Sequence, residues 1–353
     1  MIFLGGDDRL TLSNGTNTLN VANTETIIGG TGKDTVTLTT SLHNGMVDLG
    51  SGNDTLNLAN GGNTVTVSNV ETIQGGTGDD VIKLGTALTP DTVIDGGRGQ
   101  DTLELANINQ TVNLKNVQVE TLVLGTTASY VLNAPNDTVP TGTTMTIDGS
   151  TLATGSLAFD GSSETDGQFV IKGGNSSDTL VGGSLNDTLV GGGGNDTLTG
   201  AGGSDIFKYN NLSDKGTTGD TITDFTSGTS GDVINIKDLL ANSTTYNNGL
   251  GGDISNYVRF VDSGADSLLQ INANGTGDPG DYVTLVTLVG GAGTDLGTML
   301  TTPVTGTHQH SLEIGGIPPV ISGAPYSVNT LDTENVSPFG GMSFSNIDTN
   351  AVL

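Results

Sequence analysis

Aspartates recur in this chain at fixed places within glycine-rich segments. The recurring nine-residue pattern is Gly-Gly-x-Gly-x-Asp-x-apolar-x, and residues 29–37, 75–83, 96–104 and 191–199 match it in full. Glycine accepts the backbone conformations of a sharp turn and lets its carbonyl oxygen face inward, while the aspartate adds a carboxylate. Stacked turns would therefore gather carbonyl and carboxylate oxygens, an all-oxygen ligand set that suits Ca²⁺ better than Mg²⁺.

This glycine-rich turn closed by an aspartate and followed by alternating apolar residues, here called the kernel, predicts several Ca²⁺ sites. The predicted carboxylate ligands are Asp8, Asp34, Asp54, Asp80, Asp101, Asp178, Asp187, Asp196 and Asp205, and the predicted carbonyl ligands include Gly29, Gly75 and Gly96. Without cations, carboxylates stacked ~4.8 Å apart repel by on the order of 3 kcal/mol per pair at an effective dielectric of about 20. We therefore expect Ca²⁺ to be a folding partner. About nine ions, one per aspartate, would change the net charge from -28 to about -10.

The aspartates of the first 125 residues set the period of the predicted fold. Asp8, Asp34, Asp54, Asp80 and Asp101 are separated by 26, 20, 26 and 21 residues, and each interval suits one coil of a parallel β-solenoid. Apolar residues alternate after each aspartate, which places one face of a short strand in the core.

The same region aligns with itself at a shift of 46 residues. Glu25, Glu71 and Glu120 recur at one position of this repeat. Their recurrence indicates a role in the architecture of the coils, as a ladder or an auxiliary ligand, and not a catalytic pair.

Residues 173–208 carry four nonapeptides in tandem. Ser176 and Leu185 replace the fourth-position glycine in two of them, so we expect weak binding or none at those turns. The predicted fold class is all-β, a parallel β-helix or β-roll with a C-terminal non-repetitive β domain. The predicted segments are a β-helix over 1–125, a β spacer without the kernel over 126–172, a nonapeptide β-roll over 173–210, a β domain over 211–302 with a short helix near 238–242, and a proline-containing extended tail over 303–353.

Composition excludes several classes of protein. The 353 residues include 56 Gly, no Cys, and 38 acidic against 10 basic residues. Such a polyanion is an implausible partner for nucleic acid, and a disulfide scaffold is impossible. No apolar run of about 18 residues predicts a membrane span. The start of the chain is too short for a signal-peptide apolar region, so the chain stays inside the cell or leaves by a route that does not read its N-terminus.

A search for catalytic residues finds no enzyme motif, and we predict no enzymatic activity. HExxH and GxSxG are both absent. His308 and His310 would share one strand face without a nearby third ligand, which favours a tail feature over a metal site. The basic residues that could line a groove for an acidic polysaccharide are Lys33, Lys83, Arg98, Lys115 and Lys172. Solvated charge that protects strand edges is the favoured interpretation of them. Residues 272–281 resemble a loose Ca²⁺ loop, but a plain hairpin loop is favoured.

The nonapeptides resemble those of the RTX family, the calcium-binding β-roll proteins of Gram-negative secretion. The resemblance implies that alternate nonapeptides form opposite sheets and that each aspartate shares a Ca²⁺ with the turn 18 residues away. It pairs Asp178 with Asp196 and Asp187 with Asp205. The backbone ligands that it implies are Gly191, Gly193, Gly200 and Gly202.

The segment after the nonapeptides resembles the end of an RTX array. In residues 219–225, the resemblance implies that Asp220 and Asp224 close the last site and that Phe225 caps the core. Residues 257–285 look like the C-terminal target domain of type I secretion substrates, which carry an uncleaved C-terminal export signal. The first 125 residues look more like the calcium β-helices of RTX S-layer proteins and adhesins.

Together these features predict an extracellular, calcium-dependent structural protein of the cell surface or matrix, exported by type I secretion, that self-assembles into a layer or filament. The expected partner is a second copy, because a solenoid that begins at Met1 without a capping element leaves an open end, and the tail could add a strand to a neighbour. Two alternatives stay open. One is a surface adhesin that binds a cell-surface polysaccharide through 126–172 or 211–302. The other is a secreted polysaccharide-modifying enzyme.

Overall fold

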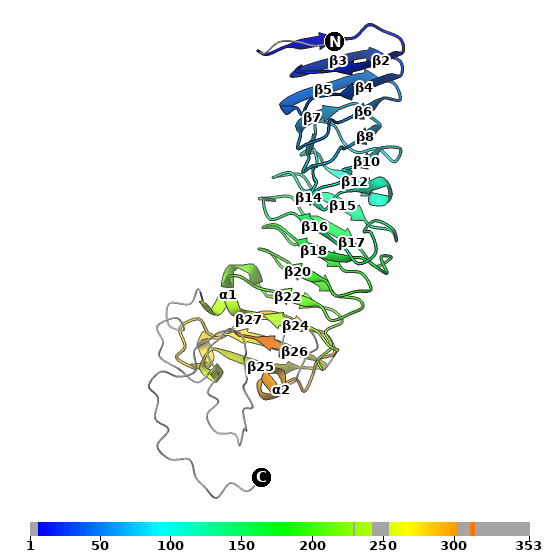
Figure 1. Cartoon of the computed structure of the whole chain (residues 1–353). Coiled ribbons are helices and arrows are strands. Elements are labelled where there is room, and N and C mark those ends of the chain that lie inside the picture. The colour runs from blue at the N-terminus through cyan, green and yellow to red at the C-terminus, as the bar shows by residue number, and fades with distance from the viewer. Residues whose placement is uncertain (1–5, 229, 242–253, 302–310, 315–353) are drawn as a thin grey trace, which may run out of the picture.

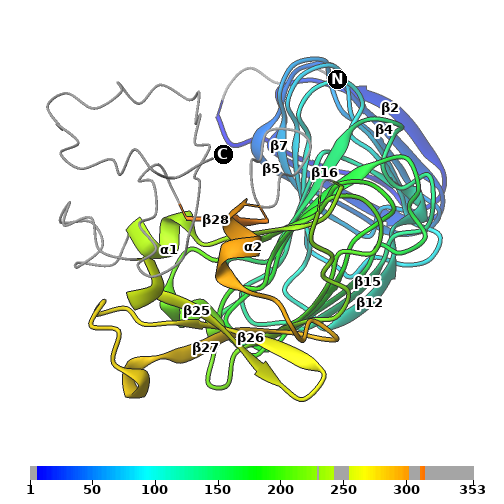
Figure 2. The same ribbon diagram turned by 90° about the horizontal axis from the view of Figure 1, so that it is seen from below.

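The protein is a long solenoid of stacked coils that ends in an antiparallel hairpin and a short helix (Figure 1). The computed structural model describes residues 6–228, 230–241, 254–301 and 311–314. Viewed along its axis, the coils superpose around one shared interior (Figure 2). The predicted all-β fold with a parallel solenoid is confirmed.

One sheet, here called the long sheet, follows the whole solenoid. It has 13 strands, and its neighbouring strands are parallel. In spatial order they are β1 (Arg9–Thr11), β3 (Thr26–Thr31), β5 (His43–Ser51), β7 (Thr64–Ser68), β9 (Val81–Leu84), β11 (Thr102–Glu104), β14 (Thr121–Val123), β16 (Thr144–Asp148), β18 (Gln168–Lys172), β20 (Thr188–Val190), β22 (Ile206–Lys208), β24 (Val233–Asn235) and β28 (Leu312–Glu313).

The other wall of the solenoid consists of two sheets in succession. The N-terminal sheet contains β2 (Asn17–Val21), β4 (Asp34–Leu38), β6 (Thr55–Asn57), β8 (Thr72–Gln74), β10 (Val93–Asp95) and β13 (Val117–Gln118). The C-terminal sheet contains β12 (Gln110–Asn113), β15 (Tyr130–Asn133), β17 (Leu157–Asp160), β19 (Thr179–Val181), β21 (Thr197–Thr199), β23 (Asp220–Ile222), β27 (Val283–Leu288), β26 (Asp266–Ile271) and β25 (Val258–Ser263). A 3-10 turn, η1 (Leu114–Asn116), separates β12 from β13, so a single coil contributes strands to both sheets.

Alternating side chains explain why these short segments pair as they do. In β4, Val36 is buried and its threonine neighbours are half-buried. Parallel pairing sets Val36 opposite Leu56 and Leu56 opposite Ile73, so that apolar side chains stack one per coil. Each fully buried side chain of this kind contributes about 1.5–3 kcal/mol.

One predicted feature of the coils is wrong. Asp34 to Asp54 is one coil, as predicted, but each 26-residue interval is one and a half coils. Asp8 precedes β1 in the long sheet, whereas Asp34 begins β4 in the N-terminal sheet. The shift of 46 residues therefore carries the kernel to the opposite wall. The two walls use the same kernel, so spacing alone does not reveal which wall an aspartate occupies.

The C-terminal end closes the solenoid. Strand β26 is antiparallel to both β25 and β27, and β27 joins the solenoid by parallel pairing with β23. The short helix expected near 238–242 is observed as α1 (Lys237–Ala241), and α2 (Leu296–Thr301) follows β27. Short 3-10 turns are η2 (Leu212–Lys215), η4 (Ile254–Asn256) and η5 (Pro279–Asp281).

The end of the array includes Phe225 and the beginning of the predicted tail. The ring centroids of Phe225 and Phe207 are 6.3 Å apart, so Phe225 packs on the core as expected. Of the predicted tail, only 311–314 is described, and β28 from this segment pairs with β24 of its own chain. His308, His310 and the rest of the tail lie outside the described residues.

Candidate metal centres

The kernel aspartates stack into columns that follow the solenoid axis. At each step, a carboxylate oxygen accepts the backbone N–H of the residue one coil earlier, at 2.6–3.0 Å. In order, column I is Asp8–Glu25, column II is Asn17–Asp34–Asp54–Glu71, column III is Asn63–Asp80–Asp101–Glu120, column IV is Leu157–Asp178–Asp196–Asp220, and column V is Phe169–Asp187–Asp205–Asp232.

Strand register produces these columns. Asp34 begins β4 and Asp54 directly precedes β6, and the two strands pair in parallel, so both side chains enter the core at the same height of their coils. The N–H of Asp34 donates to Oδ1 of Asp54 at 2.7 Å. Both side chains are fully buried. A carboxylate buried in this way requires partners for both of its oxygens.

The pairing implied by the RTX resemblance agrees with the register. Strands β19 and β21 lie in the C-terminal sheet, and β20 and β22 lie in the long sheet. The N–H of Asp178 donates to Asp196 Oδ1 at 2.9 Å, and the N–H of Asp187 donates to Asp205 Oδ1 at 2.8 Å; each pair is 18 residues apart.

Several of these carboxylates keep a second oxygen without a partner. The buried Oδ2 atoms that make no hydrogen bond belong to Asp8, Asp34, Asp54, Asp196 and Asp220. An unsatisfied buried polar atom costs about 1–3 kcal/mol, and more if it is charged. The aspartate columns therefore present anionic oxygens that a cation would satisfy.

The first glycine of a kernel supplies the space beside Oδ2 of its own aspartate. In the first two nonapeptides this Oδ2, of Asp178 and of Asp187, also accepts the backbone N–H of the second glycine. A Cβ added at Gly173 would overlap both Asp178 Oδ2 and the carbonyl oxygen of Gly191 in the next coil. A Cβ at Gly182 would likewise meet Asp187 Oδ2, and the Gly200 carbonyl oxygen at 2.6 Å. Carboxylate and carbonyl oxygens of neighbouring coils thus border the same small space, which only glycine leaves open.

The predicted carbonyl ligands divide into two groups. Gly96, Gly191 and Gly200 occupy the first kernel position and lie beside the carboxylates of their own kernels. Gly193 and Gly202 lie farther out on their turns, against the backbones of Asn175 and Ser184. Gly75 resembles the first group, because its Cβ position lies against Gly96 O and 3.0 Å from Asp80 Oδ2. Gly29 differs, because the atoms nearest its Cβ position all belong to the backbone of Leu49.

This donor set fits a hard divalent cation. Within the described ranges, no three acidic or histidine side chains converge as a metal site, so backbone carbonyls would have to complete the coordination. Ca²⁺ accepts six to eight oxygens from carboxylates, carbonyls and water in flexible geometry. The residues that would hold it are the paired aspartates of a column and the carbonyls at the first kernel position. The bound ion would neutralise their charge.

Burial changes the acidity of these side chains. It raises the pKa of Asp196 and of Asp205 from 3.8 to about 8, with neighbouring carboxylates of the column adding to the effect. Burial raises the pKa of Asp220 to about 7. In Asp101 and Asp178 it raises the pKa to about 6. In the absence of cations, protons would therefore occupy part of the columns at neutral pH.

Sequence reasoning missed the residues that begin some columns and end another. Asn63 Nδ2 donates to Asp80 Oδ1 at 2.8 Å while its backbone N–H donates to the same oxygen at 2.7 Å, and Asn17 makes the equivalent pair with Asp34. The 46-residue shift relates Asn17 to Asn63 and could have revealed both. Asp232, which ends column V, follows Asp205 by 27 residues, outside the nonapeptide spacing.

The glutamates of the 46-residue repeat end columns I, II and III. Oε2 of Glu25, Glu71 and Glu120 accepts the N–H of the preceding column residue at 2.7–2.8 Å, which gives these glutamates an architectural role at the ends of three separate columns. Asp224 has a different role from Asp220. Its two oxygens accept the N–H groups of Gly200 and Ala201 at 3.0 and 2.8 Å, so it ties down the last turn of the array.

In the two nonapeptides without a fourth-position glycine, the backbone conformation at that position differs from the one in the other two nonapeptides. Gly194 and Gly203 have φ of 125° and 117°, a conformation that side chains rarely adopt. Ser176 and Leu185, at the equivalent positions one coil earlier, do not have positive φ. Both kernels nevertheless place their aspartates in the columns.

Other residues considered from the sequence form hydrogen bonds and ion pairs within the chain. In 272–281, Asp281 Oδ2 accepts hydrogen bonds from Asn274 at 2.8 Å and Thr276 at 3.1 Å, so the loop satisfies its own polar groups. The basic side chains are dispersed over the surface. Lys83 on β9 pairs with Glu104, and Lys172, three intervening strands away on β18, pairs with Asp148.

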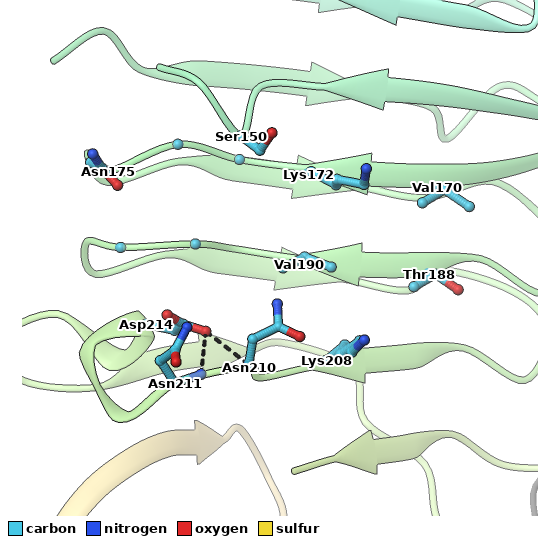
Figure 3. A pocket seen from close by; sticks show the side chains of 14 residues that line it. Ser150, Val170, Lys172, Asn175, Thr188, Val190, Lys208, Asn210, Asn211 and Asp214 are labelled. Carbon is cyan, nitrogen blue, oxygen red and sulfur yellow. Dashed lines mark hydrogen bonds between the residues drawn. The ribbon is translucent and has the colours of Figure 1, made fainter. Parts of the chain in front are cut away.

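A shallow pocket of about 380 Å³ lies on the outer face of the long sheet, over β18, β20 and β22 (Figure 3). Lys172, Val190 and Lys208 form its floor, and Asn175 and Asp214 lie at its rim. Each lysine also forms an ion pair, Lys172 with Asp148 and Lys208 with Asp238, both at 2.9 Å. Carboxylates therefore balance the charges of both lysines at the pocket.

Comparison with known proteins agrees with the geometry of the columns. Residues 67–86 and 172–207 match the RTX calcium-binding nonapeptide repeat, in four copies. A comparison with curated proteins finds no match. In the described part of the chain, no helix is long and apolar enough to cross a membrane. The chain therefore carries four copies of the RTX calcium-binding nonapeptide repeat, and their aspartates lie in the columns of buried carboxylates.

Proposed function

We propose that this chain is an extracellular structural protein of the cell surface or matrix, whose solenoid folds around Ca²⁺ and assembles into a layer or filament. The observation that carries the calcium part is the set of columns. Several of their buried carboxylate oxygens have no hydrogen-bond partner, and other Oδ2 atoms of the columns lie beside backbone carbonyls of the next coil. RTX repeats are calcium-binding and are typical of secreted proteins.

Calcium concentration would decide where the chain folds. Extracellular calcium modules bind with Kd values of ~10⁻⁴ to 10⁻³ M. A chain with such sites stays unfolded at cytosolic calcium, which suits export by type I secretion, and folds outside the cell, where calcium is millimolar. Since the ligands come together only in the folded solenoid, binding energy becomes folding energy.

The edges of the sheets support the assembly part of the proposal. Strands β1 and β2 lie at the ends of the long and N-terminal sheets and, among the described residues, each pairs with one neighbour only. Unpaired parallel strands at the end of a solenoid offer N–H and C=O groups to another coil. The proposed occupant of this edge is a second copy of the chain.

Electron microscopy with sedimentation analysis tests the proposal. Purified chain in millimolar Ca²⁺ is expected to form filaments or sheets that dissolve in EGTA, and millimolar Mg²⁺ should not replace Ca²⁺. If Ca²⁺ folds the chain but leaves monomers over a wide concentration range, the assembly part is wrong and the calcium part stands. If EGTA changes neither folding nor assembly, both parts are wrong.

A second candidate function is adhesion, which the pocket over β18, β20 and β22 favours. An acidic polysaccharide could exchange its carboxylates for those of Asp148 and Asp238 on the two lysines. Binding of a polyuronate by the calcium-loaded protein, lost in the double variant Lys172→Gln/Lys208→Gln and kept in Lys83→Gln, would support this candidate. Equal binding by the parent protein, the double variant and Lys83→Gln would exclude the pocket as the polysaccharide-binding site.

A further inference from the structure

Three buried oxygens lie together at the end of column IV, where the phenol is next to the Asp220 carboxyl and interacts with it. They are Oη of Tyr209 and Oδ2 of Asp196 and of Asp220. The three side chains are only 1%, 2% and 1% exposed. Column V ends differently, because Oδ2 of Asp232 accepts the Thr226 N–H at 2.8 Å.

The phenol reaches this place from the opposite wall. Tyr209 directly follows β22 of the long sheet, and its N–H donates to the Asn235 carbonyl at 2.9 Å. Asp196 and Asp220 belong to the C-terminal sheet, where the Asp196 N–H donates to Asp220 Oδ1 at 2.9 Å. The phenol lies next to the Asp220 carboxyl and near that of Asp196.

Surrounding groups compensate this cluster only in part, because burial raises the pKa of Asp220 to about 7 although Lys215 lowers it. Asp214, on η2, is the nearest further carboxylate, and its Oδ2 accepts the N–H groups of Asn210 and Asn211 at 2.8 and 2.9 Å. Lys215 directs Nζ to the Gly216 carbonyl at 2.9 Å. Two buried carboxylates and a buried hydroxyl are thus left to satisfy one another or a ligand, and all three can offer oxygen to a cation.

We propose that Asp196, Asp220 and Tyr209 form a cation site distinct from the other column sites, in which the neutral phenol oxygen is a ligand. The proposal rests on calcium binding by the columns and adds a ligand from outside the nonapeptide kernel. The phenol would contribute an oxygen where the array ends and no further coil continues the column. The cation class is Ca²⁺ or a trivalent lanthanide of similar size.

Terbium luminescence tests this site, because a tyrosine that contacts Tb³⁺ transfers its excitation to the ion. The chain has six Tyr and no Trp, so tyrosine is the relevant sensitiser. The full chain loaded with Tb³⁺ is expected to show emission on tyrosine excitation. Tyr209→Phe should lose most of that emission, and Tyr130→Phe should keep it. Tyr130 is the matched control, since it is equally buried but its hydroxyl already donates to the Ala106 carbonyl at 2.8 Å.

Asp196→Asn gives an independent measurement if Tyr209→Phe fails to fold. It keeps the phenol and removes one carboxylate, so sensitised emission should also be lost. Emission that survives in Tyr209→Phe, or in Asp196→Asn, overturns the proposal. A chain that folds with Ca²⁺ yet shows no sensitised emission would overturn this site and leave the proposed function standing. A chain whose circular dichroism is the same in EGTA and Ca²⁺ would overturn the proposed function itself.

Discussion

The backbone N–H of Asp34 donates to Oδ1 of Asp54 at 2.7 Å across a full coil of 20 residues. Each aspartate of a column therefore has two structural tasks. Its N–H holds the next carboxylate, and its own Oδ1 is held by the preceding coil. The geometry leaves Oδ2 of both residues buried and unpaired, which is where we expect a cation.

Replacement of one such carboxylate should have opposite consequences with and without calcium. Asp34→Asn keeps the Oδ1 that accepts the Asn17 N–H and removes the negative charge at the unpaired Oδ2. In EGTA the variant should be at least as stable as the parent chain. In Ca²⁺ it should lose about 1–3 kcal/mol of unfolding free energy because a ligand is missing. Urea titration measures both values, with a stabilising osmolyte such as sucrose added to the EGTA samples so that the calcium-free chain starts folded.

The control for this change is Asp91→Asn, an exposed aspartate outside the columns. It should alter neither value. An equal loss from Asp34→Asn in EGTA and in Ca²⁺ would mean that Asp34 is a structural residue without a cation.

The calcium-free chain should become less stable as pH rises. Folding raises the pKa of Asp196 and Asp205 from 3.8 to about 8, so the folded state keeps protons that the unfolded state has released. Their stabilising contribution is full below about pH 4 and is lost as pH rises through about 8. Urea unfolding in EGTA from roughly pH 5 to 9, with sucrose added so that the calcium-free chain starts folded, should show this fall. Calcium affinity should rise over the same window because protons compete with Ca²⁺.

The double variant Asp196→Asn/Asp205→Asn provides the comparison. Its stability in EGTA should depend less on pH than that of the parent chain. A parent chain whose stability in EGTA rises between pH 5 and 9 would contradict the assigned direction of both pKa values.

Space at the first kernel glycine should be essential. Gly173→Ala would push a methyl group into Asp178 Oδ2 and the Gly191 carbonyl oxygen, a purely steric change because Gly173 does not have positive φ. Overpacking of this kind costs about 1–3 kcal/mol. Gly280→Ala meets nothing within 4 Å and should be neutral. Calorimetric melting in Ca²⁺ checks both variants. Equal melting temperatures would argue against a space beside Asp178 Oδ2 that only glycine leaves open.

The glutamates that end columns should matter more than glutamates on the surface. Glu71→Ala leaves the N–H of buried Asp54 without its acceptor at 2.7 Å, at a cost of about 1–3 kcal/mol. Glu104→Ala breaks a 3.0 Å ion pair with Lys83 between half-exposed side chains and should cost about 0–1 kcal/mol. Chemical denaturation in Ca²⁺ gives the loss of unfolding free energy for both variants. A larger loss in Glu104→Ala would refute the role of Glu71 as the residue that ends column II.

The kernel predicts much of this architecture from local rules. Its period-two alternation predicts short strands with one buried face, and the 18-residue separation of Asp187 from Asp205 predicts their contact across one coil. The kernel does not predict that Asp8 and Asp34 lie on opposite walls of the solenoid, because a glycine turn followed by aspartate is equally suitable on either wall. It also misses Tyr209, whose approach to Asp220 crosses the core between sheets and leaves no spacing in the sequence.

The most direct test compares the thermal melt of the full chain, followed by far-ultraviolet circular dichroism, in millimolar Ca²⁺, in millimolar Mg²⁺ and in excess EGTA. Stabilisation of the columns by Ca²⁺ predicts a β spectrum with a cooperative transition in Ca²⁺, and a largely unfolded spectrum in EGTA and in Mg²⁺. The same β spectrum and the same midpoint in EGTA as in Ca²⁺ would contradict it.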